Sequence, residues 1–204
     1  QGFTMSDVVK LSLFIAADPR LGKMDFAGAN EGFNDPTVVA PLPGNPATTL
    51  GAQRLFIFNY AASIWASKLS SPVPILITAK FDPQTCTATS ATLGSTGSNS
   101  IHRDFVGAPF PSTWYVQSLA NRLFGSDLNT GATDMSITFN SNLNGQASCL
   151  GGVGWYLGTD GNEGTNTELL PVVLHEMSHG YGFASTTNGN SGSMNSGFPA
   201  AYDH

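Results

Sequence analysis

Apolar residues spaced three and four positions apart predict a long amphipathic helix over residues 51–70. They share one helical face and are Leu55, Phe58, Ala62, Trp65, Ala66 and Leu69. Pro72 ends this helix, because proline lacks the backbone N–H that a further turn would use. Residues 73–81 then alternate largely between apolar and polar side chains, as a strand does. A strand that follows a helix directly indicates a fold that mixes the two.

Two more helices and a second strand are predicted by the same patterns. Residues 114–125 form a helix that ends at Gly125, and residues 134–140 alternate as a strand. Residues 167–183 are apolar on most sides, which predicts a largely buried helix with Thr165 or Thr167 as its N-cap. This mixture predicts an α+β fold.

The remaining segments have weaker patterns. Residues 1–50 contain several turn signals and few periodic positions, so we expect an irregular N-terminal arm. Residues 82–113 are rich in Ser, Thr and Gly and contain short strand-like pieces such as residues 87–93. The glycine-heavy residues 151–167 suggest an edge strand and a turn. Because no repeat or shift in composition divides the rest, residues 51–204 are expected to form a single domain.

The composition excludes several classes of protein. Hydrophobic residues make up 41% of the 204 residues, too many for a disordered chain. Charged residues make up only 11%, the net charge is −6 and no basic cluster exists, so no nucleic-acid partner is expected. Apolar runs are broken within about ten residues, whereas a membrane span needs about eighteen or more. We expect a monomer that has no membrane partner.

The cysteine content indicates the compartment. The chain has two cysteines, Cys86 and Cys149, and it is poor in Lys and rich in Thr, Asn and Gly, as many secreted proteins are. Thiols oxidise outside the cell. We therefore expect a secreted protein with a Cys86–Cys149 disulfide, the alternative being two buried free thiols.

The third predicted helix carries a constellation of two histidines and a glutamate. His175 and His179 are four residues apart, so both imidazoles project from one face within reach of one ion, while Glu176 lies about 100° around the axis. Zinc takes imidazole nitrogens at about 2.0 to 2.1 Å, and catalytic sites have three protein ligands. Glu176 would accept a proton from the attacking water and pass it to a leaving amine. Chance produces these three identities on the order of 10⁻³ times per chain of this composition.

The run HEMSHGYGF, residues 175–183, resembles the active-site helix of the zincin metallopeptidases. Residues 32–204, with GFNDP, NPATTLGAQRLFIFNYAASIW, SPVPI and WYLGTDG, resemble more narrowly a group of secreted bacterial proteins assigned as peptidases. The resemblance implies that the two histidines bind zinc and that Glu176 is the general base. It also implies a zincin-like fold, with a twisted mixed sheet, a backing helix at residues 51–70 and the active-site helix beneath the sheet. A polypeptide substrate would lie extended along an edge strand.

The motif does not identify the third zinc ligand. Metzincins continue the motif as H-E-x-x-H-x-x-G-x-x-H, and Gly182 matches the glycine, but Ser185 occupies the last position. Gluzincins use a later Glu, and no Glu follows Glu176. Asp203 is the favoured ligand, as in aspzincins, because a carboxylate oxygen is a normal zinc ligand. The alternatives are a ligand beyond a truncated end, His204, Glu163, Asp160 and His102.

The sequence evidence for a metal-binding or catalytic role is weaker at several other residues. Residues 159–164, TDGNEG, have the oxygen-rich composition of a Ca²⁺ loop but not the EF-hand spacing, so a turn is favoured. Met194 is interpreted as a gap-filling side chain and not as the counterpart of the metzincin methionine turn. Tyr181 and Tyr202 are interpreted as half-buried aromatics and not as donors to an oxyanion.

These observations predict a secreted zinc metalloendopeptidase that hydrolyses peptide bonds. Its metal ligands would be His175, His179 and Asp203, with Glu176 as the base, in a catalytic domain over residues 51–204 whose C-terminal subdomain is short or missing. One alternative is an extracellular adhesion or binding module that keeps a zincin fold without turnover. Another is a truncated fragment of a larger peptidase.

Overall fold

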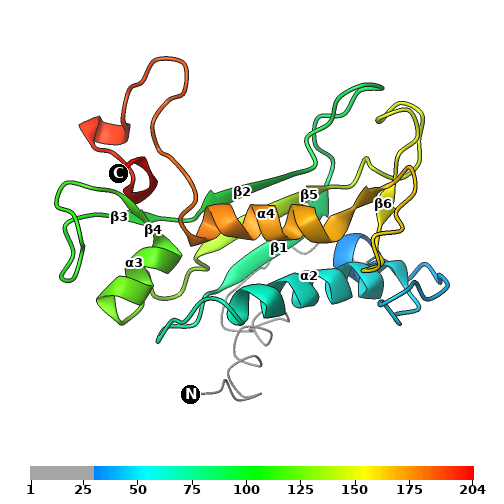
Figure 1. The fold of residues 1–204 in the computed structure, drawn as a ribbon, viewed down its shortest axis with the longest axis horizontal. Helices are drawn as coiled ribbons and strands as arrows, with labels where there is room; N and C mark the ends of the chain where they lie inside the picture. The colour runs from blue at the N-terminus through cyan, green and yellow to red at the C-terminus, as the bar shows by residue number, and fades with distance from the viewer. Residues whose placement is uncertain (1–29) are drawn as a thin grey trace.

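The computed structural model describes residues 30–204 (Figure 1). Residues 1–29, the greater part of the predicted N-terminal arm, lie outside the described residues. Residues 30–49 contain the short helix η1 (Gly32–Asn34) and bridges such as the one between Val38 and Thr49. The α+β prediction is confirmed, because residues 30–204 contain both α-helices and small, separate sheets, and the strands come in runs instead of alternating with helices.

The central sheet has three strands in the order β1-β5-β2. Strands β1 (Ile77–Asp82) and β5 (Met135–Asn140) run parallel, and β2 (Gly94–Ser98) runs antiparallel to β5. Side chains alternate between the two faces of a sheet, and one face is buried and apolar. On β1 and β5 this face consists of Ile77, Ala79, Phe81, Met135, Ile137 and Phe139.

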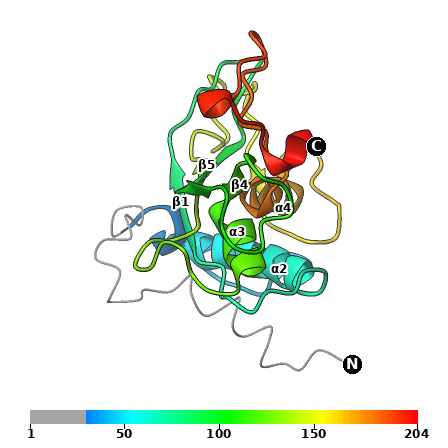
Figure 2. The ribbon, with the colours of Figure 1, turned by 90° about the vertical axis from the view of Figure 1, so that its left-hand side faces the viewer.

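Two helices cover the apolar face of the sheet. Helices α2 (Leu50–Ala66) and α4 (Leu169–Tyr181) lie side by side on it, as the two views in Figures 1 and 2 show. Phe58 of α2 and Phe139 of β5 are fully buried and meet edge to face, with ring centroids 6.2 Å apart. Burying such a ring is worth about 2 kcal/mol, so these contacts fix the helices on the sheet.

Smaller elements surround this core. Strands β3 (Ile101–His102) and β4 (Tyr115–Val116) form an antiparallel pair, followed by α3 (Gln117–Phe124). Strands β6 (Trp155–Tyr156) and β7 (Thr167–Glu168) form a parallel pair. Short helices η2 (Asn195–Gly197) and η3 (Ala201–Asp203) lie in the C-terminal segment. None of the helices within residues 30–204 is both long and apolar enough to cross a membrane.

Several predicted boundaries differ from the structure. The helix predicted over residues 114–125 begins at Gln117, because Tyr115 and Val116 pair with β3, while its end at Gly125 is confirmed by a left-handed φ of 88°. Helix α4 begins at Leu169, because Thr167 and Glu168 pair with β6. Neither predicted threonine caps this helix.

The strand-like interpretation of residues 87–93 is wrong. The Thr87 hydroxyl accepts the N–H of Ser90 at 3.0 Å and closes a turn there. The strand begins after this turn and covers Gly94–Ser98. Its sequence, GSTGS, has no apolar alternation, so pairing with β5 makes it a strand.

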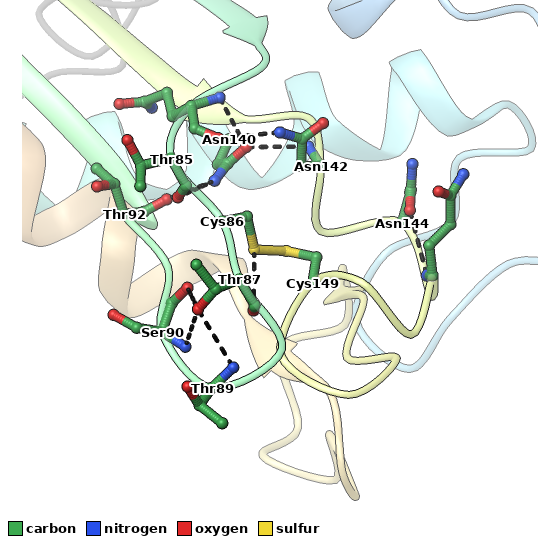
Figure 3. The surroundings of a disulfide bond; sticks show 12 residues. Thr85, Cys86, Thr87, Thr89, Ser90, Thr92, Asn140, Asn142, Asn144 and Cys149 are labelled. Carbon is green, nitrogen blue, oxygen red and sulfur yellow. Dashed lines mark hydrogen bonds between the residues drawn. A yellow bond between two sulfur atoms is a disulfide. The ribbon is translucent and has the colours of Figure 1, made fainter.

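The predicted Cys86–Cys149 disulfide is confirmed. It joins the segment after β1 to the segment after β5 (Figure 3). Asn140 lies close by and is fully buried; its amide donates to the carbonyl oxygens of Thr92 at 2.7 Å and Thr85 at 3.3 Å. The disulfide and these hydrogen bonds together fix the segment that leads into β2.

Candidate functional site

The structure brings His175 and His179 together on one face of α4. Their Nε2 atoms are 3.0 Å apart, with ring centroids 4.6 Å apart and ring planes nearly perpendicular. Two nitrogens that bind one tetrahedral zinc at about 2.0 to 2.1 Å lie about 3.3 Å from each other. The pair therefore fits a single ion with a small adjustment of either ring.

A backbone carbonyl orients the ring of His179. The Nδ1–H of His179 donates to the carbonyl oxygen of Phe183 at 2.7 Å. A hydrogen bond of this kind fixes the tautomer and leaves the lone pair on Nε2, the atom that faces His175. Gly182 makes this contact accessible, because its φ of 124° turns the chain at the end of α4 and brings Phe183 back towards the helix.

Glu176 is directed away from solvent towards β2. The residue is buried, and its Oε2 accepts a hydrogen bond from the Thr96 hydroxyl at 2.9 Å. Gly94, two residues earlier on the same strand, lies so close that an added Cβ would be 2.9 Å from the Glu176 Cγ. The carboxylate is therefore enclosed between α4 and the edge strand.

A groove of about 420 Å³ opens beside the carboxylate. Its lining comes from the start of β2, the segment before it and one side of α4, and consists of Thr92, Leu93, Gly94, Pro171, Val172, His175 and Glu176. The walls of this groove are mostly apolar, with one imidazole and one carboxylate beside them. Such a lining is typical of a site that binds an apolar part of a ligand next to the polar side chains of the protein.

Asp203, the favoured third ligand, lies in the segment that returns towards the end of α4 (Figure 1). Its Oδ2 accepts hydrogen bonds from the Thr187 hydroxyl and the Ala200 N–H, each at 2.9 Å. Hydrogen bonding from Ser185 is the largest cause that lowers the pKa of this carboxyl, and the Ala200 N–H lowers it further. Ser185 is the residue that stands at the last metzincin position, so Asp203 lies beside that point of the chain.

The structure does not place Asp203 against the two histidines. Within residues 30–204, no three side chains of His, Cys, Asp or Glu come close enough together to hold one ion. The link between the two regions is the ring of Phe183, which contacts the ring of Tyr202 with centroids 6.2 Å apart. Tyr202 precedes Asp203 directly.

The alternative third ligands are held elsewhere. His204 stacks on Phe110, and its Nε2 lies 3.0 Å from the Thr113 hydroxyl. Asp160 accepts a hydrogen bond from Asn162. Burial is the main cause that raises the pKa of Glu168, just before α4, and the charges of Glu163 and Asp160 raise it further.

His102 lies in β3 and contacts the Ser100 hydroxyl through Nε2 at 2.9 Å. Burial lowers its pKa, and the charge of Asp127 acts in the opposite direction.

Three side chains differ from their expected surroundings. Met194 is exposed, so the gap-filling interpretation is wrong. Tyr181 is buried against Trp65, and burial raises its pKa, whereas Tyr202 is 59% exposed. Neither tyrosine is half-buried as expected.

Sequence reasoning missed two partners of the site, the carbonyl of Phe183 and the hydroxyl of Thr96. The first depends on the path of the chain after Gly182, which no local pattern fixes. The second has no local signal.

Comparison with protein-family models, curated proteins and solved structures finds no match to this chain.

Proposed function

We propose that this protein is a secreted zinc-dependent endopeptidase with a zincin-like fold. The observation that carries the proposal is the pair of Nε2 atoms 3.0 Å apart, one of which has its lone pair fixed by the Phe183 carbonyl. Two imidazole nitrogens at this distance repel each other unless a proton or a cation lies between them. Glu176 follows His175 directly and lines the same groove, so it can act as the base that accepts a proton from water.

Zinc would be held by His175, His179 and a third ligand, which we assign to Asp203. Bound there, zinc supplies a Lewis acid that polarises a carbonyl and makes water more acidic. The hydrogen bond from His179 to Phe183 keeps that ring in the orientation needed for binding. The assignment of Asp203 is supported by its place beside Ser185 and by the contact between Tyr202 and Phe183.

Glu176 would carry the proton. As the oxygen of water attacks the carbonyl carbon of a peptide bond, the carboxylate accepts the proton released. The C–N bond then breaks, and the same carboxylate passes the proton to the leaving amine. Its buried position next to the groove favours this role, because the group is screened from bulk water yet lines the space where a ligand would lie.

The substrate would be an extended polypeptide paired with β2. This strand is an edge of the sheet, and no strand within residues 30–204 pairs with its outer side. An edge strand offers backbone N–H and C=O groups to an added strand. The apolar groove next to Leu93 and Val172 would take a side chain of that substrate.

Two measurements on the purified chain test the proposal. We expect about one zinc per chain by atomic spectroscopy, and cleavage of denatured casein that a chelator abolishes. Glu176→Gln should lower turnover by about 10² to 10⁴-fold, the usual contribution of a general base, and keep its zinc. Glu31→Gln, an exposed glutamate distant in sequence, is the matched control and should cleave as the wild type does.

The result that would overturn the proposal is a chain that binds no zinc, or a Glu176→Gln variant that cleaves casein at the wild-type rate. Zinc binding without cleavage would instead indicate the binding module considered above. The third ligand is tested separately: Asp203→Ala should weaken zinc binding by more than about 100-fold, the upper cost of losing an outer partner, and His204→Ala should leave it unchanged.

A further inference from the structure

The edge strand β2 differs from its neighbours at the positions that face the helices. Where β1 and β5 present buried apolar side chains, β2 presents Gly94, Thr96 and Ser98. The pairing register puts Thr96 opposite Ile137 and Gly94 opposite Phe139, so these residues share the helix-facing side. Burial of apolar side chains on the helix-facing side stabilises a core strand, and β2 lacks this contribution.

Gly94 is explained by Glu176 and not by the backbone. Its φ lies outside the left-handed region, so any residue could adopt its conformation. An added Cβ would, however, lie 2.9 Å from Cγ, 3.0 Å from Oε1 and 3.1 Å from Cδ of Glu176. Strand β2 therefore has a glycine at the position next to the Glu176 side chain. Oε1 of Glu176 is the carboxylate oxygen that faces Gly94.

Thr96 holds the other oxygen of the same carboxylate. Its Oγ1–H donates to Oε2 at 2.9 Å, and it is the one hydrogen bond to this carboxylate among the side-chain hydrogen bonds of residues 30–204. A buried carboxylate is costly without a donor, and a hydrogen bond to a charged group is stronger than one between neutral groups. Threonine suits the task, because its β-branched side chain has few rotamers in a strand.

We propose that Thr96 is a positioning residue for Glu176: it fixes Oε2 so that Oε1, on the Gly94 side, is the oxygen that takes and returns the proton. The inference rests on the proposed function. Because Thr96 belongs to the strand that would pair with the substrate, the hydrogen bond also sets the distance between the base and the bound polypeptide. The Thr96 side chain contacts neither zinc nor the reacting atoms of the substrate in this proposal.

The first test compares three threonine variants in casein cleavage. Thr96→Val keeps the shape and removes the donor, so kcat should fall about 10- to 100-fold while KM stays within about twofold. Thr96→Ser keeps the donor and should retain kcat within about threefold. Thr138→Val makes the same change on β5, at a position that faces away from the helices, and should behave as the wild type. All variants should bind zinc as the wild type does.

A second test needs neither zinc nor turnover. In zinc-free protein, Thr96→Val should lower Tm by about 3 to 8 °C, the effect of one hydrogen bond to a charged group in a chain of this size. In a Glu176→Ala background the same substitution should leave Tm unchanged, since its partner is gone.

The two tests separate the inference from the proposed function. Equal losses of Tm in both backgrounds, or a Thr96→Val enzyme with wild-type kcat, would overturn the positioning role. A wild-type chain without any cleavage would overturn the proposed function and the catalytic part of the inference with it. The Tm comparison would still decide whether Thr96 holds Glu176.

Discussion

Asp134 is a buried carboxyl whose environment opposes its charge. Only 3% of the residue is exposed, and burial is the main cause that raises the pKa of its carboxyl to about 6. The Leu76 N–H, which donates to it at 2.6 Å, acts in the opposite direction, whereas the charge of Asp127 raises the pKa further. The native protein therefore binds a proton at Asp134 more tightly than an unfolded chain does, because an ordinary aspartate has a pKa of 3.8.

This difference predicts how stability depends on pH. A folded-state pKa above the unfolded value gives a contribution that is complete below pH 3.8 and is lost as the pH rises through 6. We expect the free energy of unfolding, measured in urea, to fall by about 2 kcal/mol between pH 4 and pH 6 because of this group. Asp134→Asn should remove the decline.

The control for this experiment is Asp104→Asn, which changes an exposed aspartate and should keep the decline. An Asp134→Asn profile as steep as that of the wild type would show that another group is responsible.

At the residue scale, the sequence predicts the parts of the site that lie within one helix. His175, Glu176 and His179 follow from a spacing that the helix itself enforces. The Phe183 carbonyl and the Thr96 hydroxyl depend on the path of the chain after Gly182 and on the pairing of β2 with β5. Such contacts are set by tertiary structure, so no local pattern reveals them.

At the scale of elements, helix α4 approaches the sheet closely at Gly180. An added Cβ there would lie 2.0 Å from the Sδ of Met135 and 2.6 Å from its Cε. Met135 is fully buried in β5. Glu176 is one helical turn before Gly180 on the same face, so this close approach also brings the glutamate to β2.

Gly180→Ala tests this packing. Alanine favours a helix by about 1 kcal/mol over glycine, but overpacking a core costs about 1 to 3 kcal/mol. We expect a net loss of about 1 kcal/mol in the free energy of unfolding, measured in urea, together with lower turnover, because either the buried Met135 side chain or α4 itself must shift. Gly189→Ala changes a glycine with open space around it and should leave both quantities unchanged. A Gly180→Ala protein more stable than the wild type would contradict the close packing.

The elements that the sequence predicts best are those whose side chains repeat with the period of their own structure. Helix α2 and strand β5 are of this kind, and both lie within a few residues of their predicted ranges. Strand β2 is not, because Gly, Ser and Thr carry no periodic signal. Its conformation comes from hydrogen bonds to β5 and from the space that Glu176 requires.

At the scale of the whole molecule, the disulfide closes a long loop. Cys86 and Cys149 are separated by 63 positions, and a cross-link of that span stabilises the fold by about 4 kcal/mol through the unfolded chain. Replacing both cysteines with serine should lower Tm by about 10 °C in a calorimeter. A reductant should lower the Tm of the wild type and not that of the variant. Equal Tm values for the two proteins would contradict this account.

The α+β class of the molecule follows from its elements, but the order β1-β5-β2 does not. The two parallel strands are far apart in the sequence, and their pairing depends on contacts that form across that distance. The sequence therefore predicts which segments become strands more readily than which strands become neighbours.

The location of the two cysteines links the oxidation state of the chain to the pairing of β1 with β5. Each cysteine follows one of two parallel neighbours, β1 and β5, so alignment of those strands holds the two sulfur atoms within bonding reach of each other. Trapping free thiols at intervals during refolding would report when the bond closes, and the return of the sheet signal in the same samples would show whether this slow, long-range strand pairing comes before or after it. Once closed, the bond keeps the ends of β1 and β5 close together even when the sheet between them opens.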